Sequence, residues 1–233
     1  MEKRVKISRL FFQNERGPEG SQVALTRTIL AEERLLLGSI GSSLAGAGLT
    51  RADIESAGII VGIDSVIDKI KESYFKGVAE EGSLGASPLF FPYTSPNVLA
   101  ARATIHFGIK GPDITIASGP LSFLKAVSYA YCLVSSGTVG LAVAAGVTEG
   151  ISVAMLIGLD KSDLSITSVV ESRVDPDLRP DVSLSMRDTF SIFQEALSVA
   201  ADLPVEASDL SGNTIRIGLT FDNGVALKEE AFV

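Results

Sequence analysis

Apolar and polar positions follow two different spacings along the chain, and these spacings predict strands and helices in turn. Short apolar runs predict strands at residues 5–12, 59–62, 113–117, 139–145, 151–159 and 166–170. Apolar residues at helical spacing predict helices at 26–47, 66–74, 96–107, 121–136 and 187–201. Because strands alternate with helices in the first part, we expect an α/β fold with a mainly parallel sheet there, covered by helices.

Local signals refine this pattern. Thr50 can cap a short turn that carries Asp53. Residues 77–93, rich in Gly, Ser and Pro, predict a long loop of the kind that usually serves a function or faces a partner. The helix at 121–136 has small and apolar residues on all sides, so it should be buried. Near the end, Asp222 to Gly224 predict the turn of a hairpin between strands at 214–221 and 225–230.

Composition narrows the classes of function. The net charge is −8 and no basic stripe is present, which argues against nucleic-acid binding. The mean hydropathy of +0.33 fits either a large core or a surface buried against a partner. The most apolar region, 139–159, is interrupted by Glu149, so we expect no membrane span. The first residues lack the pattern of a signal peptide, and we expect a soluble, cytoplasmic protein.

Cofactor and metal sites are not expected from this sequence. One cysteine and one histidine cannot build a zinc site of the usual His/Cys type, and a single cysteine allows no intrachain disulfide. The 22 glycines form neither a phosphate-binding loop nor a dinucleotide-binding fingerprint. We therefore predict no metal and no cofactor.

Three segments, taken in order, resemble the N-terminal half of β-ketoacyl synthases. The first reads AGAGLT at 45–50 and AGIIVG at 57–62. The second joins Phe91-Pro92 and Pro96-Asn97 to FGIKGP at 107–112. The third is DITIAS at 113–118, then a helix rich in small residues, then AAGVTE at 144–149. Each motif is weak alone, but their order and spacing together resemble the family over residues 25–159.

The resemblance implies a thiolase-like α/β fold, with a mixed sheet covered by helices and a shortened second half. It divides the chain into a ketosynthase-like part at 1–172, a linker at 173–186 and a βαββ-like part at 187–233 that packs in the same domain. Residues 187–203 and 217–223 are only faintly similar to the family's late helix and Gly-rich hairpin. Most of the family's C-terminal half is absent.

The position of the family's nucleophile is occupied by Pro120. Ketosynthases place a cysteine at the start of the buried helix after the central strand, where the helix N-terminus favours the thiolate and the backbone N–H helps hold the oxyanion. Proline has neither a thiol nor an N–H, although it suits the first turn of a helix. The family's later catalytic histidines are also missing, because the only histidine, His106, precedes the central strand. We expect no condensing activity. Whether the chain is an enzyme of another kind stays open, and the missing residues argue against it.

For the other candidate residues, both a structural and a functional role were considered. Ser118 is a weak candidate nucleophile and a better candidate for a helix cap. Cys132 should be a buried, inert thiol, and His106 a structural residue. The resemblance implies that Phe90, Phe91 and Asn97, with Ser118 and Gly119, border an acyl pocket or a subunit interface; packing of the loop is the alternative. It also implies that the strand residues Ile114, Thr115, Ile116 and Ala117 form a dimer interface.

The leading hypothesis is a catalytically silent ketosynthase-like subunit, such as a chain-length factor, in fatty acid or polyketide biosynthesis. It would form a homodimer or a heterodimer with an active ketosynthase, and an acyl-carrier protein is a further candidate partner. The alternatives are an acyl-thioester hydrolase or transferase with altered chemistry, acting through Ser118 or water, and a homodimeric scaffold protein.

Overall fold

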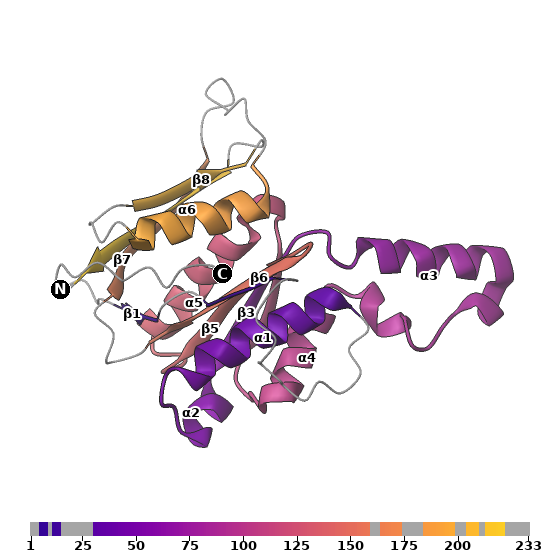
Figure 1. The fold of residues 1–233 in the computed structure, drawn as a ribbon, viewed down its shortest axis with the longest axis horizontal. Helices are drawn as coiled ribbons and strands as arrows, with labels where there is room; N and C mark the ends of the chain where they lie inside the picture. Colours follow the sequence, from indigo (N-terminus) through magenta and orange to yellow (C-terminus); the bar gives the residue numbers. More distant parts are fainter. Residues whose placement is uncertain are drawn as a thin grey trace.

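A single sheet of nine strands runs through the molecule (Figure 1). The computed structural model describes residues 5–8, 11–14, 30–158, 164–173, 184–198, 204–209 and 213–221. The strand order is β4-β3-β5-β6-β1-β7-β9-β8, and β2 also pairs with β6. The strands are β1 Val5–Ile7, β2 Phe11–Asn14, β3 Gly58–Ile63, β4 Asp113–Ala117, β5 Ala142–Thr148, β6 Ile151–Ile157, β7 Leu164–Arg173, β8 Pro204–Ser208 and β9 Asn213–Phe221.

The sheet is mixed, and its parallel part is confined to three strands. β3 pairs in parallel with β4 on one side and with β5 on the other, while the other recorded strand pairs are antiparallel. The expectation of a mainly parallel sheet is therefore wrong beyond these strands. Only Glu149 and Gly150 separate β5 from β6, which is room for a hairpin turn but not for the crossover that a parallel pair needs. The expected α/β fold with a mixed sheet covered by helices is confirmed.

Helices cover both faces of the sheet. They are α1 Ala31–Ala45, α2 Arg51–Ser56, α3 Asp68–Glu81, α4 Val98–Phe107, α5 Ser122–Ser135 and α6 Met186–Ser198, with 3₁₀ turns η1 Gly82–Gly85, η2 Phe91–Thr94 and η3 Gly119–Leu121. Side chains alternate along β3, as in any strand. Ile60 packs with residues of α5 and α6 in one apolar cluster, whereas Ile59 and Val61 pack with residues of α1 and α4 in another. The core therefore has two layers, one on each face.

An arm formed by residues 68–94, which contain α3, η1 and η2, projects from this body (Figure 1). No residue of α3 is buried. The predicted helix end at Tyr74 and the predicted loop from Gly77 are wrong, since α3 continues to Glu81. Gly77 and Gly85 form a close backbone contact instead of a loop. A Cβ on Gly77 would lie 3.0 Å from the backbone oxygen of Gly85, and a Cβ on Gly85 would lie closer still to the backbone of Gly77. They allow η1 to fold back closely onto α3.

Several element boundaries also differ from the prediction. The strand predicted at 5–12 is two strands, β1 and β2, and α4 begins at Val98 instead of Pro96. β8, which forms a hairpin with β9, was not predicted from the sequence. The predicted strand at 225–230, its turn at 222–224 and most of the linker at 173–186 lie outside the described residues. No helix in the described part of the chain is long and apolar enough to cross a bilayer.

Candidate functional site

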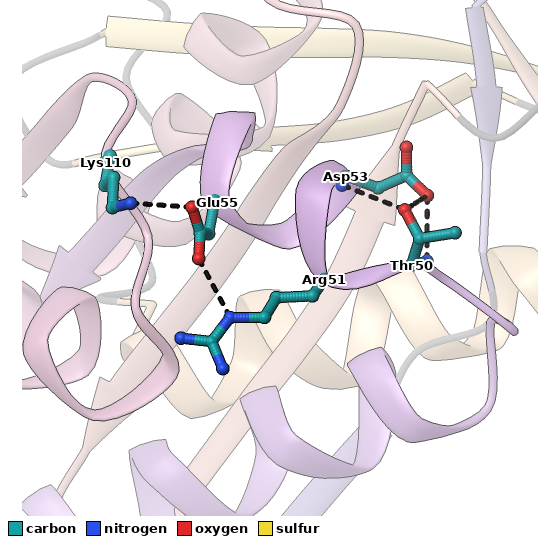
Figure 2. Close-up of polar contacts among 5 residues, drawn as sticks. All are labelled: Thr50, Arg51, Asp53, Glu55 and Lys110. Carbon is teal, nitrogen blue, oxygen red and sulfur yellow. Dashed lines mark hydrogen bonds and ion pairs between the residues drawn. The ribbon is translucent and has the colours of Figure 1, made fainter.

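The turn between α4 and β4 determines where β4 begins. The Lys110 backbone N–H donates to the backbone oxygen of Glu55 at 2.8 Å, and Lys110 Nζ donates to Glu55 Oε2 at 2.6 Å (Figure 2). A Cβ on Gly111 would collide with the backbone at the end of α2. Next, the Pro112 carbonyl accepts from the Ile59 N–H at 2.8 Å. This short motif thus sets the parallel register of β4 on β3.

The capping of α2 supports the same turn. As predicted, Thr50 caps this helix: its Oγ1 accepts from the Asp53 N–H at 3.2 Å, and Asp53 Oδ2 accepts from the Thr50 N–H at 2.8 Å (Figure 2). Hydrogen bonds from Thr50 lower the pKa of Asp53. Hydrogen bonds from Lys110 and then from Arg51 lower the pKa of Glu55. The Glu55 carboxylate holds the Lys110 turn in place, and Asp53 caps the helix that carries Glu55.

The junction between β4 and α5 is a tight turn. Gly119 takes the left-handed conformation, with φ +56°, directly after Ser118. Ser122 Oγ accepts from the Ser118 N–H at 2.7 Å and donates to the Gly119 carbonyl at 2.8 Å. Pro120 lies in η3, and α5 itself begins two residues later, at Ser122. Pro120 therefore leads into the helix and does not occupy its first position.

Ser118 does not act as a helix cap. It stands at the N-cap position of η3, but its side chain makes no capping hydrogen bond, so that prediction is wrong. Ser122, which is fully buried, makes the turn-closing bonds instead. The Ser118 hydroxyl is left to accept from Lys125 Nζ at 3.1 Å, and both of these residues are half-buried. Lys125 is the only charged residue of α5, but no motif in the sequence pointed to it.

Two glycines let the helices approach the sheet at this junction. A Cβ on Gly62, in β3, would lie 2.6 Å from the Phe123 backbone nitrogen and closer still to the Ser122 carbonyl. A Cβ on Gly146, in β5, would lie 2.8 Å from the Phe190 ring. Both glycines belong to the motifs singled out from the sequence. Only glycine fits at Gly62, since the obstructing atoms belong to the backbone.

Helix α6 closes one side of the junction. Thr189, which is fully buried, donates from Oγ1 to the Pro120 carbonyl at 3.1 Å and to the Met186 carbonyl at 2.7 Å. The rings of Phe190 and Phe193 pack edge-on against Phe123, with centroid separations of 5.2 and 5.6 Å. Pro120 therefore lies at the contact between α5 and α6.

Three polar residues, Asp64, Ser118 and Thr148, lie at the carboxyl ends of the three parallel strands. β3 ends before Asp64, β4 ends before Ser118 and β5 ends at Thr148; β3 pairs with both neighbours up to its last residue. Burial, and then the nearby Asp68, raises the pKa of Asp64. Ser65 has φ +50°, an uncommon conformation for a residue other than glycine. The carboxyl ends of parallel strands are where ligands usually bind in α/β proteins.

The comparisons with known proteins decide the family. The family model described as β-ketoacyl synthase, N-terminal domain, matches residues 24–176. The chain belongs to the β-ketoacyl synthase family. No curated protein matches it.

Solved ketosynthase structures share the fold at low sequence identity. The ketosynthase ApeO in complex with its chain length factor ApeC from Xenorhabdus doucetiae matches with a TM-score of 0.65 and 12% identity, covering 93% of this chain and 99% of that chain. The ishigamide ketosynthase/chain length factor matches with a TM-score of 0.58 and 17% identity, covering 88% and 83%. Ketosynthase twelve of the bacillaene polyketide synthase in Bacillus amyloliquefaciens matches with a TM-score of 0.50 and 14% identity, covering 70% and 36%.

The interface predicted for this ketosynthase-family chain lies at one edge of the sheet. β4 pairs only with β3 among the described strands, so its other edge is open. Its middle residues, Ile114 to Ile116, are half-buried, and its end residues are exposed. Thr115 Oγ1 is buried and has no hydrogen-bond partner in the described structure.

Three of the residues predicted to border an acyl pocket, Phe90, Phe91 and Asn97, have surroundings of their own. Phe90 and Phe91 belong to the arm; Phe91 is 62% exposed and Phe90 is half-buried. Asn97 is exposed and accepts from Ser95 Oγ at 2.5 Å. No recorded hydrogen bond or ring contact in the described residues joins these three to Ser118. Their acyl-binding role stays a prediction.

The remaining candidates are Cys132 and His106. Cys132 is exposed, so the expectation of a buried thiol is wrong. The reason is that α5 buries only the side that faces the sheet, and leaves Cys132 and Tyr129 outside. His106 is half-buried on α4, with its ring edge-on to Phe107 at 4.7 Å between centroids. The described residues contain no group of three His, Cys, Asp or Glu that could hold a metal ion.

Proposed function

We propose that this chain is a ketosynthase-fold subunit that does not condense acyl units and works beside an active ketosynthase. The observation that carries the proposal is Pro120 in η3, between β4 and α5, where the family resemblance places the nucleophilic cysteine. Proline supplies no thiol and no backbone N–H. Loss of one oxyanion donor costs roughly 10²–10³-fold in rate, and loss of the nucleophile removes the covalent route altogether.

The open edge of β4 supports pairing with a second ketosynthase-fold chain. An edge strand presents unpaired backbone groups, which another strand can complete. Ile114 and Ile116 would bring apolar side chains to that contact. One of the matched structures is a ketosynthase in complex with its chain length factor. This supports a role like that of a chain-length factor, in polyketide or fatty acid biosynthesis.

The arm offers a second surface for the same partner. It carries four of the large apolar side chains that remain exposed: Phe75 at 54%, Leu84 at 91%, Leu89 at 61% and Phe91 at 62%. Exposed apolar residues gathered on one projecting element usually mark a site of protein association. We propose that the arm lies against the partner chain, and that Phe91 with Phe90 and Asn97 reaches the acyl chain bound there.

Co-expression with the ketosynthases encoded nearby tests the pairing. Light scattering after size exclusion should show a heterodimer, and the partner should make a different product length with and without this chain. Ile116→Arg on β4 should weaken the heterodimer, because a charge would enter the strand contact. Pro204→Arg, on the edge strand at the other end of the sheet, is the control that should leave it intact.

Two results would overturn the proposal. One is a purified chain that, alone, releases carbon dioxide from a malonyl thioester and extends an acyl primer. The other is a homodimer that binds none of these ketosynthases and leaves product length unchanged, which is the behaviour of a scaffold protein. Binding of an acyl-carrier protein can be measured in the same preparations.

A further inference from the structure

We propose that Ser118 and Lys125 form a nucleophile and base pair that cleaves acyl thioesters through an acyl-serine. This activity is separate from condensation and does not depend on the proposed pairing with a ketosynthase. It uses a hydroxyl two residues before Pro120 and an amine one turn into α5.

The backbone around Ser118 has the form that exposes a nucleophile. Ser118 lies between a strand and a helix, and Gly119 after it takes φ +56°, so the chain turns sharply at this residue. Serine nucleophiles of hydrolases commonly stand at such a sharp strand-to-helix turn. Ser122 holds the turn with hydrogen bonds of 2.7 and 2.8 Å on either side of Ser118. The turn also lies at the carboxyl end of the parallel strands, where a ligand can be bound.

Lys125 has a different kind of partner from Lys69, Lys76 and Lys110. Lys69, Lys76 and Lys110 each pair with a glutamate. Lys125 is half-buried, and its recorded contact within the described residues is a hydrogen bond to Ser118 Oγ at 3.1 Å, not an ion pair with a carboxylate. As an ammonium group it donates to the hydroxyl oxygen; as a neutral amine it can accept the hydroxyl proton across the same distance. Serine–lysine pairs of this kind replace the serine–histidine pair in known enzymes.

The chemistry balances without a cofactor. Ser118 Oγ attacks the thioester carbonyl and its proton passes to Lys125 Nζ. The carbon–sulfur bond breaks, and the leaving thiolate takes that proton. Water then attacks the ester on Ser118, which releases the carboxylic acid and restores the hydroxyl. Nothing is oxidised or reduced.

The oxyanion would have one backbone donor. In hydrolases with a sharp nucleophile turn, the N–H of the following residue donates to the oxyanion, and here that residue is Gly119. Pro120 adds no donor. Since a missing oxyanion donor lowers the rate by roughly 10²–10³-fold, we expect both the formation and the hydrolysis of the acyl-serine to be slow.

The test uses the full chain and a hexanoyl thioester of N-acetylcysteamine. Thiol release is followed with a thiol-reactive dye, and the acylated residue is located by mass spectrometry of peptides. The expected result is release by the native chain and a hexanoyl group on Ser118. Ser118→Ala and Lys125→Met should each lower release by about 100-fold or more.

The variant Lys125→Arg distinguishes two roles of Lys125: accepting the Ser118 proton, and placing a positive charge beside Ser118. Arginine keeps a cation near Ser118 but does not give up its proton, so this variant should be as slow as Lys125→Met. Lys76→Met, on the exposed arm, is the matched control that should release thiol at the native rate. Circular dichroism spectra of all variants should match that of the native chain.

Three outcomes overturn the proposal: a folded native chain that releases no thiol and carries no acyl group, an acyl group found on a residue other than Ser118, or full activity in Lys125→Arg. Labelling of the native chain by a fluorophosphonate provides a readout that needs no variant, and label on Ser118 is the expected result. Any of the three would leave the heterodimer experiment untouched, so the two proposals fail separately.

Discussion

The centre of the sheet and the projecting arm are close in sequence but differ in how they are held. All six residues of β3 are buried, whereas none of the 14 residues of α3 is buried. The strand is stabilised by packing on both faces; the arm relies on a few contacts of its own, such as the one between the Tyr74 and Phe91 rings, 6.1 Å apart. We infer that the sheet centre determines whether the chain folds, while the arm depends on its anchor to the body.

That anchor is a buried carboxylate. Tyr93, in η2, donates from its hydroxyl to Glu33 Oε2 at 2.5 Å, and Arg102 donates from Nε to Glu33 Oε1 at 2.8 Å. Glu33 is 1% exposed and Tyr93 is 3% exposed. The hydrogen bond that Arg102 donates to Glu33 raises the pKa of Arg102. The three residues join the end of the arm to α1 and α4.

The largest difference should appear between two phenylalanines. Phe123→Ala removes a fully buried ring from the cluster with Phe190 and Phe193, and should lower the free energy of unfolding by about 3–5 kcal/mol. Phe75→Ala removes a ring that is 54% exposed on the arm, and should change it by less than about 0.5 kcal/mol. Urea unfolding measures both. Equal losses would show that the arm is part of the core.

A pair of glycines gives the next largest effect. Gly62→Ala places a methyl group against the backbone of the first turn of α5, and should cost about 1–3 kcal/mol or prevent folding. Gly140→Ala is the matched control, because a Cβ there meets nothing within 4 Å. It should leave the urea midpoint unchanged. A tolerated Gly62→Ala would contradict the close approach of α5 to β3.

The sequence predicted the sheet centre much better than the arm or the site. The bounds of β4 were predicted correctly, because its apolar run is enclosed by Pro112 and Gly119. The end of α3 was predicted wrongly. Gly77 and Gly85 suggested a loop, but they form a close contact between α3 and η1. Glycine permits both outcomes, and only the tertiary structure selects one.

The candidate site shows the same limit. The sequence placed Ser118 and Pro120 at the strand-to-helix junction, where the structure has them. It could not show that Ser122 would close the turn and leave Ser118 for Lys125. Those partners depend on the rotation of α5 about its axis, which the nearly continuous apolar pattern of that helix does not determine.

Loss of the anchor charge should loosen the arm more than the body. Glu33→Gln removes the carboxylate that Tyr93 and Arg102 share, and should lower the free energy of unfolding by about 1–2 kcal/mol. Amide hydrogen exchange should become faster in residues 82–94 and stay unchanged in β3. Glu80→Gln, on the exposed arm, is the control. Equal acceleration in β3 would show that Glu33 stabilises the whole chain and not the arm in particular.

The smallest effect is expected at the root of the arm, where Asp64 joins β3 to α3. Burial, and then Asp68, raises the pKa of Asp64 in the folded chain above its ordinary value. The folded state therefore binds this proton more tightly than the unfolded state, and the free energy of unfolding falls as pH rises through the raised pKa. Asp64→Asn cannot ionise, so the difference between variant and native chain should grow from about pH 3 to pH 7 in favour of the variant, reaching less than about 1 kcal/mol.

Asp53 provides a control for that experiment, because its substitution should change stability with pH in the opposite direction. Its pKa is lowered by hydrogen bonds from Thr50, so the native carboxylate contributes stability at neutral pH that is lost as pH falls through the lowered pKa. Asp53→Asn should therefore be less stable than the native chain at pH 7, and the gap should narrow in acid. Urea midpoints measured across this range distinguish the two residues. If Asp64→Asn follows the native curve at every pH, the Asp64 carboxylate is as well solvated as the arm itself, and the boundary between buried sheet and exposed arm lies before this residue.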